Sequence, residues 1–314
     1  MGKTTIEWTK NADGTAGKTW GVLRGCSRKS PGCGGGGSFS GEPGQRGGCY
    51  AERIAGRFSG IDKNGKPGVF AGFATMTDKG ARWTGKVALV VDALDEPLRV
   101  RTPTTWFISM SDLFHEELTN EEIAAVFGVM AASPRHTFQI LTKRSTRMRD
   151  WFAWLAIEQE REGDIWVPLL RETCERVSDR WVERLHEDGA ARSPEQEPWP
   201  LPNVWLGVSV EAAAYKHRLD NLRACPAAVR FTSLEPLLDD LGSVDFTGID
   251  QAIVGAESGH GARPMFDDWV RKIRDQAVAQ GTAFFFKQMA VNGRKVSLPM
   301  LDGVQWAQMP ARTT

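Results

Sequence analysis

The run TWFISMSD, residues 105–112, joins a short apolar stretch of β-branched and aromatic residues to an abruptly polar end. Such a run is typical of a buried strand that reaches one edge of a sheet. Comparable runs recur along the chain, and we predict strands at 18–22, 86–91, 105–110, 137–142, 203–209, 229–233, 250–255 and 282–287. Helical stretches lie between several of these runs, which favours a parallel sheet. Eight strands in 314 residues predict an α/β fold, a complete or incomplete TIM-like (β/α) barrel, as a single domain over 1–314.

Two helices have clear sequence signals. Thr119 with Glu122 three residues later forms a capping-box pattern before IAAVFGVMAA. Asp267 and Asp268 begin WVRKIRDQAVAQ, and Gly281 ends it. Residues 212–224 are also predicted to be helical, so helices separate the later strands.

Two segments interrupt the alternation of strands and helices. Residues 34–48 contain eight glycines and one proline, which predicts a flexible loop. Residues 156–200 are highly charged and end in EQEPWPLP, which predicts helices followed by an exposed linker. We interpret the second segment as an insertion on the barrel.

Composition limits the classes of partner. Lys plus Arg and Asp plus Glu each number 39, so no overall positive field draws the chain to nucleic acid, although a local basic patch remains compatible with it. No apolar run approaches the roughly 18–20 residues of a membrane span. The first ten residues lack the apolar core of a signal peptide. We expect a soluble cytoplasmic protein without a membrane partner, and the sequence does not give its oligomeric state.

The cysteines carry the strongest chemical signal. There are five, an odd number in a chain without an export signal, which argues against a disulfide framework. Cys26, Cys33 and Cys49 fall within one Gly-rich segment after the first predicted strand. Thiolates bind zinc or iron–sulfur clusters, and a closed zinc site takes four ligands. Only three ligands are present locally, because no histidine precedes His115.

Three thiolates on a 4Fe–4S cluster leave one iron free for a substrate. S-adenosylmethionine can chelate that iron, and one electron from an external donor then yields a 5′-deoxyadenosyl radical. We therefore predict Cys26, Cys33 and Cys49 as ligands of such a cluster. The alternative is a structural zinc site completed by Cys174 or Cys225.

Polar residues follow nearly every predicted strand, and in a barrel such ends meet on the face where active sites form. Six of these ends carry reactive or ionisable side chains: Ser109-Met110-Ser111-Asp112, Thr142-Lys143-Arg144, Ser209-Val210-Glu211, Ser233-Leu234-Glu235, Glu257-Ser258 and Lys287-Gln288. Each polar end taken alone is ordinary loop chemistry, but their number predicts a site.

Five further side chains are predicted to bind the cofactor. Lys143 and Arg144 suit the carboxylate of S-adenosylmethionine or a substrate phosphate, with a solvated pair as the alternative. Ser209 and Glu211 lie at one strand end, where the carboxylate suits ribose hydroxyls or an amine. Tyr50 would pack against the cluster or the adenine, with a core aromatic as the alternative.

Three ionisable residues are predicted to be catalytic. Glu235 suits a substrate amine or ribose hydroxyls. Glu257 lies in a Gly-flanked turn that allows close approach of a ligand. Lys287 ends the apolar run AFFFK, so its ammonium must reach the barrel mouth or a partner.

Further stretches make the chain resemble a phage-associated three-cysteine-motif family that is similar to radical S-adenosylmethionine enzymes. The resemblance covers nearly the whole chain. It rests on TIEW (5–8), GC (25–26), SPGC (30–33), CYAE (49–52), SMSDLFH (109–115), LTKR (141–144), NVWLGVS (203–209), SLEP (233–236), GAESG (255–259), ARPM (262–265) and KQ (287–288). The family usually keeps two residues between its second and third cysteines, whereas this chain has fifteen, which we expect to loop out and return Cys49 to the cluster.

The resemblance implies a role in phage biology, in the host cytoplasm if the chain is phage-encoded. It implies an isomerase or another base-modifying enzyme that acts in DNA hypermodification, for example on an amino-acid-decorated thymidine in DNA or in a nucleotide. By analogy, Ser109, Ser111 and Asp112 would receive amino or ribose groups of the cofactor. The alternative for these three residues is a helix N-cap before LFHEEL.

Two other functions remain open from the residues. One is a zinc-stabilised, non-catalytic nucleic-acid-binding protein of a phage. The other is a barrel enzyme with ordinary acid–base chemistry on Glu211, Glu235, Glu257 and Lys287, which would survive loss of the three cysteines. Metal content distinguishes the zinc-stabilised protein from the radical enzyme. Replacement of the cysteines distinguishes the acid–base enzyme from the radical enzyme.

Overall fold

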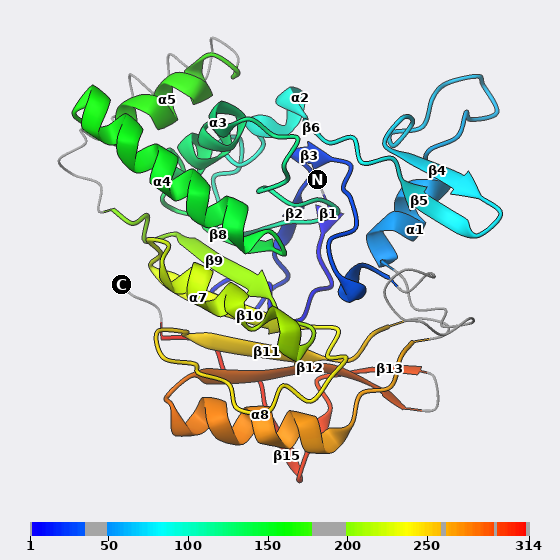
Figure 1. The fold of residues 1–314 in the computed structure, drawn as a ribbon. Coiled ribbons are helices and arrows are strands. Elements are labelled where there is room, and N and C mark those ends of the chain that lie inside the picture. Colours follow the sequence, from blue (N-terminus) through cyan, green and yellow to red (C-terminus); the bar gives the residue numbers. More distant parts are fainter. Residues whose placement is uncertain (1, 35–48, 178–198, 259–261, 292–293, 312–314) are drawn as a thin grey trace. The chain divides into compact units, whose positions relative to one another are not determined.

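The computed structural model describes residues 2–34, 49–177, 199–258, 262–291 and 294–311 (Figure 1). The chain divides into two compact units. The first comprises Met1–Arg24, Val87–Leu206 and Ala224–Ala228, and the second comprises Gly25–Lys86, Gly207–Arg223 and Val229–Thr314. The prediction of one domain over 1–314 stays a prediction.

The first unit contains a sheet of apolar, mostly buried strands. Its strand order is β1 (Gly2–Lys3), β2 (Lys18–Trp20), β7 (Thr105–Ile108), β8 (Thr137–Thr142) and then the beginning of β9 (Val204–Ser209). β2 pairs parallel with β7, and β7 with β8, whereas β1 is antiparallel to β2. Two short strands, β3 (Leu23–Arg24) and β6 (Ala88–Leu89), form a separate antiparallel ladder before the short helix α2 (Val91–Leu94). The carboxyl ends of β7 and β8 therefore point the same way.

Helices α3 (Asn120–Ala131), α4 (Ser145–Glu162) and α5 (Trp166–Cys174) pack together in this unit (Figure 1). The capping box at the start of α3 is present, with the Thr119 hydroxyl accepting from the Glu122 amide and the Glu122 carboxylate accepting from the Thr119 amide. Phe127 stacks on Trp151 with ring centroids 4.5 Å apart. A side chain at Gly128 would collide with the backbone of Leu169, so the glycine allows α5 to approach α3 closely.

The second unit contains the remaining strands of the main sheet. From the end of β9 the order continues with β10 (Val229–Leu234), β11 (Gln251–Gly255), β12 (Ala283–Val291) and β13 (Arg294–Ser297). β10, β11 and β12 are mutually parallel, and β13 is antiparallel to β12. The register shifts between Val254 and Gly255, at the carboxyl end of β11. This irregularity lies two residues before Glu257, one of the predicted catalytic residues.

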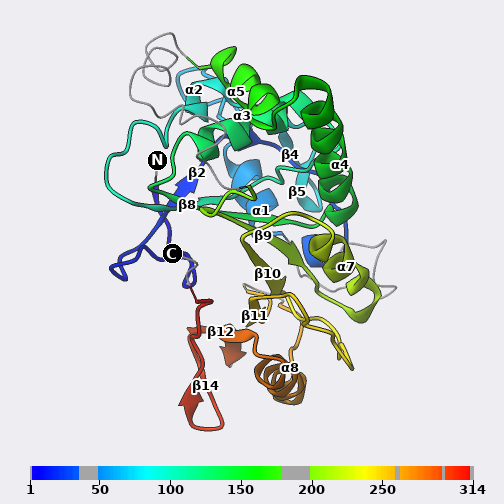
Figure 2. The same ribbon diagram turned by 90° about the vertical axis from the view of Figure 1, so that its left-hand side faces the viewer.

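Two helices, a 3₁₀ turn and a short hairpin accompany the sheet of the second unit. Helix α8 (Asp267–Ala279) packs on β12, and helix α7 (His217–Arg223) follows the turn η3 (Ala213–Tyr215). Figure 2 shows the hairpin of β14 (Met300–Leu301) and β15 (Val304–Gln305) projecting beyond β12. Fully buried Phe231, Phe284 and Phe286 fill the core of this unit.

The amino-terminal part of the second unit carries the cysteines. It contains the 3₁₀ turn η1 (Pro31–Cys33), helix α1 (Tyr50–Arg57) and the antiparallel hairpin of β4 (Ala74–Thr77) and β5 (Gly80–Trp83). A side chain at Gly56 would collide with Ala81 and Met76, so this glycine lets the hairpin lie against α1.

Most of the predicted elements are confirmed, with three corrections. The strand predicted at 86–91 is only the two-residue β6, which pairs with β3 outside the main sheet, and the helix predicted at 212–224 shortens to η3 and α7. Antiparallel strands β1 and β13 flank the parallel ones, and the described strands show no closed barrel. The fold is mixed α/β with a large, mostly parallel sheet.

The two predicted interruptions are only partly described. The loop at 34–48 lies outside the described residues except for Gly34, and 178–198 of the predicted insertion lie outside them as well. The described start of the insertion forms the end of α4 and all of α5, and α5 packs on α3. None of the described helices is both long and apolar enough to cross a membrane.

Candidate functional site

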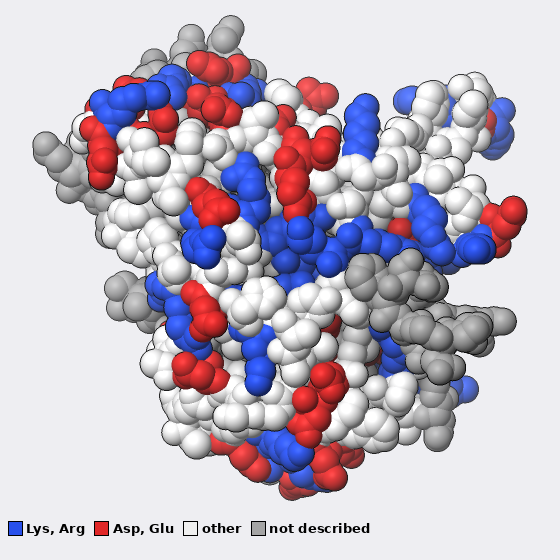
Figure 3. All heavy atoms as spheres, in the orientation of Figure 1, with Lys and Arg blue, Asp and Glu red and all other residues white. Residues whose placement is uncertain are grey.

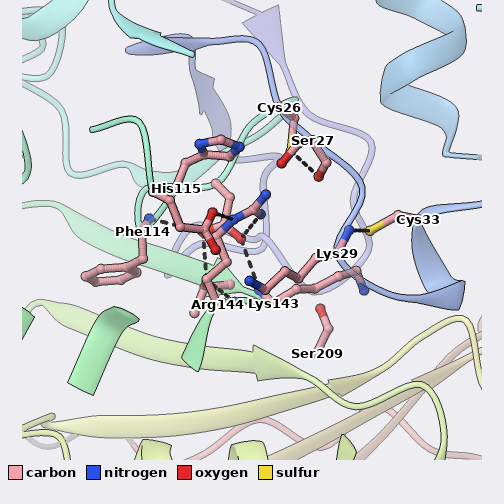
Figure 4. A network of polar contacts seen from close by, with 12 residues as sticks. Cys26, Ser27, Lys29, Cys33, Phe114, His115, Lys143, Arg144 and Ser209 are labelled. Atoms are coloured by element: carbon pink, nitrogen blue, oxygen red, sulfur yellow. Dashed lines mark hydrogen bonds and ion pairs between the residues drawn. The ribbon is translucent and has the colours of Figure 1, made fainter. Parts of the chain in front are cut away.

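Cys26, Cys33 and Cys49 all belong to the second unit, and each is half-buried and outside any disulfide. In Figure 4 a dashed line joins Cys26 to Ser27, whose carbonyl oxygen accepts from the Cys26 thiol at 3.4 Å. Another joins Lys29 to Cys33, because the Lys29 amide donates to the Cys33 sulfur at 3.4 Å.

An ion pair joins the two sides of the undescribed segment 35–48. The Arg28 guanidinium meets the Glu52 carboxylate, with Nη2 to Oε2 at 2.5 Å and Nε to Oε1 at 3.2 Å. Glu52 is 2% exposed and also accepts from the Trp83 amide at 2.9 Å. Arg28 lies between the first two cysteines, and Glu52 lies three residues after the third. The pair therefore holds the start of α1 against the Cys26–Cys33 segment.

Cys49 is the N-cap residue of α1. Burial raises the pKa of its thiol, and the nearby Cys33 raises that pKa further. The backbone amides of Glu52 and Ala51, in the first turn of α1, act in the opposite direction and lower that pKa. Cys33 therefore contributes to the electrostatic environment of Cys49.

Glu211 fastens the turn that precedes Cys33. Its side chain is fully buried, and Oε1 accepts from the Ser30 hydroxyl and from the Gly32 amide at 3.3 Å. Its other oxygen accepts from Arg218 at 2.9 Å, and Arg218 also donates to the Ser209 carbonyl oxygen at 2.7 Å. A side chain at Gly32 would crowd the carboxylate. Glu211 thus ties the end of β9 to the cysteine turn.

A second clamp reaches the same turn from the loop after β11. Glu257 holds Arg263 through three contacts, from the Arg263 amide and Nε at 2.9 Å each and from Nη2 at 2.7 Å. The Nη2 of Arg263 also donates to the Pro31 carbonyl oxygen at 3.0 Å. The turn before Cys33 is therefore held from two strand ends.

Lys287, in the middle of β12, and Glu235, directly after β10, form a partly accessible ion pair. The ammonium nitrogen lies 2.8 Å from both carboxylate oxygens, and the side chains are 14% and 17% exposed. Gly255 leaves room for Glu235, because a side chain there would come within 3.2 Å of its carboxyl carbon. Such a pair can hold a zwitterionic group, with each charge facing its opposite.

Tyr50 lies within electrostatic range of this pair. Desolvation by the surrounding protein raises the pKa of its phenol to about 12, and the charges of Cys49 and Glu235 contribute to the increase. About half of the side chain nevertheless meets solvent. The phenol is therefore a neutral hydrogen-bonding group near the cysteines at physiological pH.

The strand ends of the first unit form their own buried network. The Asp112 carboxylate accepts from the Thr142 hydroxyl at 2.7 Å, the Lys143 amide at 3.1 Å and Arg144 Nη1 at 3.0 Å. It also accepts from the Phe114 amide at 3.0 Å, which makes a turn where an N-cap was the alternative prediction. Figure 4 labels Phe114, Lys143 and Arg144 from this network. Both oxygens of Asp112 are engaged by the protein.

The other predicted residues of the first unit differ in exposure. Arg144 is 3% exposed, and its Nε meets Glu116 at 2.6 Å, so its guanidinium is already held by two carboxylates. Ser109, Ser111 and Lys143 are half-buried at the ends of β7 and β8. These three are therefore more open to a ligand than Asp112 and Arg144.

The structure thus assembles the predicted residues in two groups, one in each unit. The first unit holds five of them: Ser109, Ser111, Asp112, Lys143 and Arg144. The second unit holds the other nine: Cys26, Cys33, Cys49, Tyr50, Ser209, Glu211, Glu235, Glu257 and Lys287. Among the described residues, which include all five cysteines, no three His, Cys, Asp or Glu side chains gather as ligands of a single metal ion.

Sequence reasoning missed the residues that hold the cysteine segment. Glu52 and Arg263 lie inside stretches that carry the resemblance, and Arg28 lies between two of them, yet none received a role there. Arg218 had no signal at all. The available signal was the presence of charged residues in a Gly-rich or cysteine-bearing stretch. A charge that is buried in such a stretch requires a partner, which would have pointed to an ion pair.

The family comparison matches nearly the whole chain. The model of DUF5131, described as a protein of unknown function, matches residues 3–310. No curated protein and no solved structure matches the chain.

Proposed function

The chain belongs to the DUF5131 family, and for this member we propose the activity of a radical S-adenosylmethionine enzyme. In this proposal Cys26, Cys33 and Cys49 hold a 4Fe–4S cluster, and the enzyme rearranges or otherwise modifies a nucleobase substituent during phage DNA hypermodification. The observation that carries the proposal is the Arg28–Glu52 ion pair, which links the segment of the first two cysteines to the helix of the third.

The donor set fits a cluster with three protein ligands. None of the three thiols is in a disulfide, all are half-buried within one unit, and the charge of Cys33 contributes to the raised pKa of Cys49. A structural zinc ion needs its ligands around one centre at about 2.3 Å for sulfur. A cluster instead places each thiolate on a different iron, so its ligands are spaced more widely.

The bound cluster would supply the electron that cleaves S-adenosylmethionine to a 5′-deoxyadenosyl radical. The chain's own contribution is to hold the cysteine turn rigid, orient the substrate and exclude water. Glu211 and Arg263 perform the first task from the ends of β9 and β11. Preorganisation of this kind reduces the cost of assembling a site.

The Lys287–Glu235 pair is the proposed substrate anchor. An amino acid attached to thymidine carries an ammonium and a carboxylate, and these would pair with Glu235 and Lys287 respectively. Partial exposure of both side chains leaves them accessible to such a group. Glu257 remains a predicted catalytic residue, with its carboxylate engaged by Arg263.

The proposal also includes the residues predicted to bind the cofactor, the form of the fold and the electron donor. Tyr50, Ser209 and Glu211 are proposed near the cofactor in the second unit. In the first unit Ser109, Ser111, Asp112, Lys143 and Arg144 stay predicted contacts of S-adenosylmethionine. The proposal includes an incomplete TIM-like barrel as the fold. A reducing electron donor is the required partner.

The direct test is reductive cleavage of S-adenosylmethionine. Protein prepared without oxygen and reduced with dithionite should release 5′-deoxyadenosine, and each Cys→Ala variant at positions 26, 33 and 49 should not. A Cys174→Ala variant is the matched control and should retain cleavage. Cleavage that survives loss of all three cysteines, or absence of cleavage in the iron-loaded wild type, would refute the proposal.

A further inference from the structure

One face of α1 is covered by aromatic, aliphatic and basic side chains. Residues 51, 52, 55 and 56 are buried, whereas Tyr50, Arg53, Ile54, Arg57 and Phe58 are exposed. We call these five residues the α1 face. Their spacing of three and four residues places them side by side along the helix. Phe58 is 55% exposed, and with Tyr50 and Ile54 it makes a group of large apolar side chains on this face.

The α1 face also lies in a locally basic segment. Residues 49–86 contain seven Lys or Arg and three Asp or Glu, a net charge of +4 in a chain whose net charge is zero. One of the three acids, Glu52, is already neutralised by Arg28. In Figure 3 blue predominates over red around α1 and β5. A local patch of this kind concentrates anions even when the whole chain is neutral.

The arginines of the α1 face differ from those of α8 in their pairing. Arg271, Lys272 and Arg274 on α8 each meet an aspartate at 2.5–2.9 Å, and blue and red intermix over that helix in Figure 3. Within the described part of the chain, the guanidinium groups of Arg53 and Arg57 meet no carboxylate. The two arginines therefore present unneutralised charge beside Phe58.

We propose that the α1 face binds a single strand of DNA, with Arg53 and Arg57 on phosphates and Phe58 stacked on a base. Exposed arginines beside an aromatic ring provide the two contacts that single-strand binding requires, charge on the backbone and stacking on the bases. The choice of DNA over RNA rests on the proposed function, whereas the surface itself does not depend on a cluster. The α1 face would thus bind the DNA strand itself, whereas Lys287 and Glu235 would bind the modified base.

The test measures binding of a fluorescein-labelled single-stranded oligodeoxynucleotide by anisotropy at several salt concentrations. The Arg53→Ala/Arg57→Ala variant should bind at least tenfold more weakly at low salt, with a salt-dependence slope reduced by about two. Phe58→Ala should weaken binding about fivefold or more while leaving the salt slope unchanged, because stacking releases no counterions. Arg271→Ala/Lys272→Ala on α8 is the charge-matched control and should bind like the wild type.

The outcomes separate this inference from the activity. Binding retained by the Cys26→Ala/Cys33→Ala/Cys49→Ala variant would support the α1 face even if no radical chemistry were found. Equal losses in the α1 and α8 variants, or unchanged binding in both α1 variants, would overturn it. A wild-type dimer that becomes monomeric in Ile54→Asp, measured by sedimentation, would make the face an interface between two copies and would also overturn it.

Discussion

Arg28 and Glu52 form an ion pair across the spacer between the second and third cysteines, with Nη2 to Oε2 at 2.5 Å and the Glu52 carboxylate buried. Fifteen residues separate Cys33 from Cys49, and a chain that long does not by itself fix where its ends lie. The ion pair, together with the Trp83 amide on Glu52, supplies the missing constraint.

The first prediction concerns this pair. Arg28→Ala should destabilise the protein by about 3 kcal/mol, because it leaves the Glu52 charge buried with only Arg82, 3.9 Å away, as a remaining cation. Urea unfolding of both single variants and of Arg28→Ala/Glu52→Gln forms a double-mutant cycle. We expect a coupling energy above about 1 kcal/mol. Strictly additive losses would mean that the two side chains do not interact in solution.

The second prediction concerns the clamp on the cysteine turn. Glu211→Gln removes the charge that Arg218 and Ser30 share, so the turn should open more often. Alkylation of Cys33 in metal-free protein should then be about tenfold faster, a loss of about 1.4 kcal/mol of local stability. Cys174 in the same sample reports any global loosening, and Glu116→Gln, whose side chain is 47% exposed, is the matched variant. Equal acceleration at Cys33 and Cys174 would argue against a local clamp.

The third prediction separates substrate binding from cofactor cleavage. Lys287→Met should lower conversion of an amino-acid-decorated thymidine about 100-fold, because the anchor for its carboxylate is lost. Cleavage of S-adenosylmethionine without substrate should persist, since the cysteines are untouched. Lys272→Met on α8, where the lysine pairs with Asp240, should leave both measurements unchanged. Full conversion by Lys287→Met would remove Lys287 from the site.

The fourth prediction is a pH dependence of the first unit. His136 is 1% exposed, accepts from the Thr104 amide at 3.1 Å and donates to the Pro97 carbonyl oxygen at 3.0 Å. Burial lowers its pKa to about 4, so the folded state binds fewer protons than the unfolded state between pH 4 and 6.5. Stability from this group is therefore complete above pH 6.5 and lost as the pH falls toward 4, by up to about 3 kcal/mol.

His136→Gln is the variant that checks this pH dependence. The difference in unfolding free energy between wild type and variant should shrink as the pH falls from 6.5 to 4, because only the wild type loses the histidine contribution. A difference that stays constant over that range would show that His136 titrates normally in the folded state.

The sequence predicted the strands well because their signal is local. Runs such as TFQILT and TAFFFK are apolar enough to define β8 and β12 within one or two residues at their amino-terminal ends. The capping box of α3 is equally local. The strand at 86–91 was overestimated because its short pairing with β3 depends on a distant segment. Sheet closure likewise depends on strand ends that no local pattern encodes.

The site was predicted by residue type and position but not by contact. Glu211 was identified as a strand-end carboxylate, yet its link to Ser30 spans 181 residues and leaves no local trace. Asp112 was predicted to face a ligand, whereas four protein donors surround it. Such buried carboxylates cannot be told from exposed ones by their neighbours in sequence, because partners come from other strands.

The central claim is that Cys26, Cys33 and Cys49 hold a 4Fe–4S cluster. Iron, acid-labile sulfide and zinc should be measured in protein prepared without oxygen, beside the Cys26→Ala/Cys33→Ala/Cys49→Ala variant. We predict about four irons and four sulfides per chain with a brown absorbance, all lost in the variant. One zinc per chain and no sulfide would contradict the account and favour the zinc-stabilised nucleic-acid-binding protein.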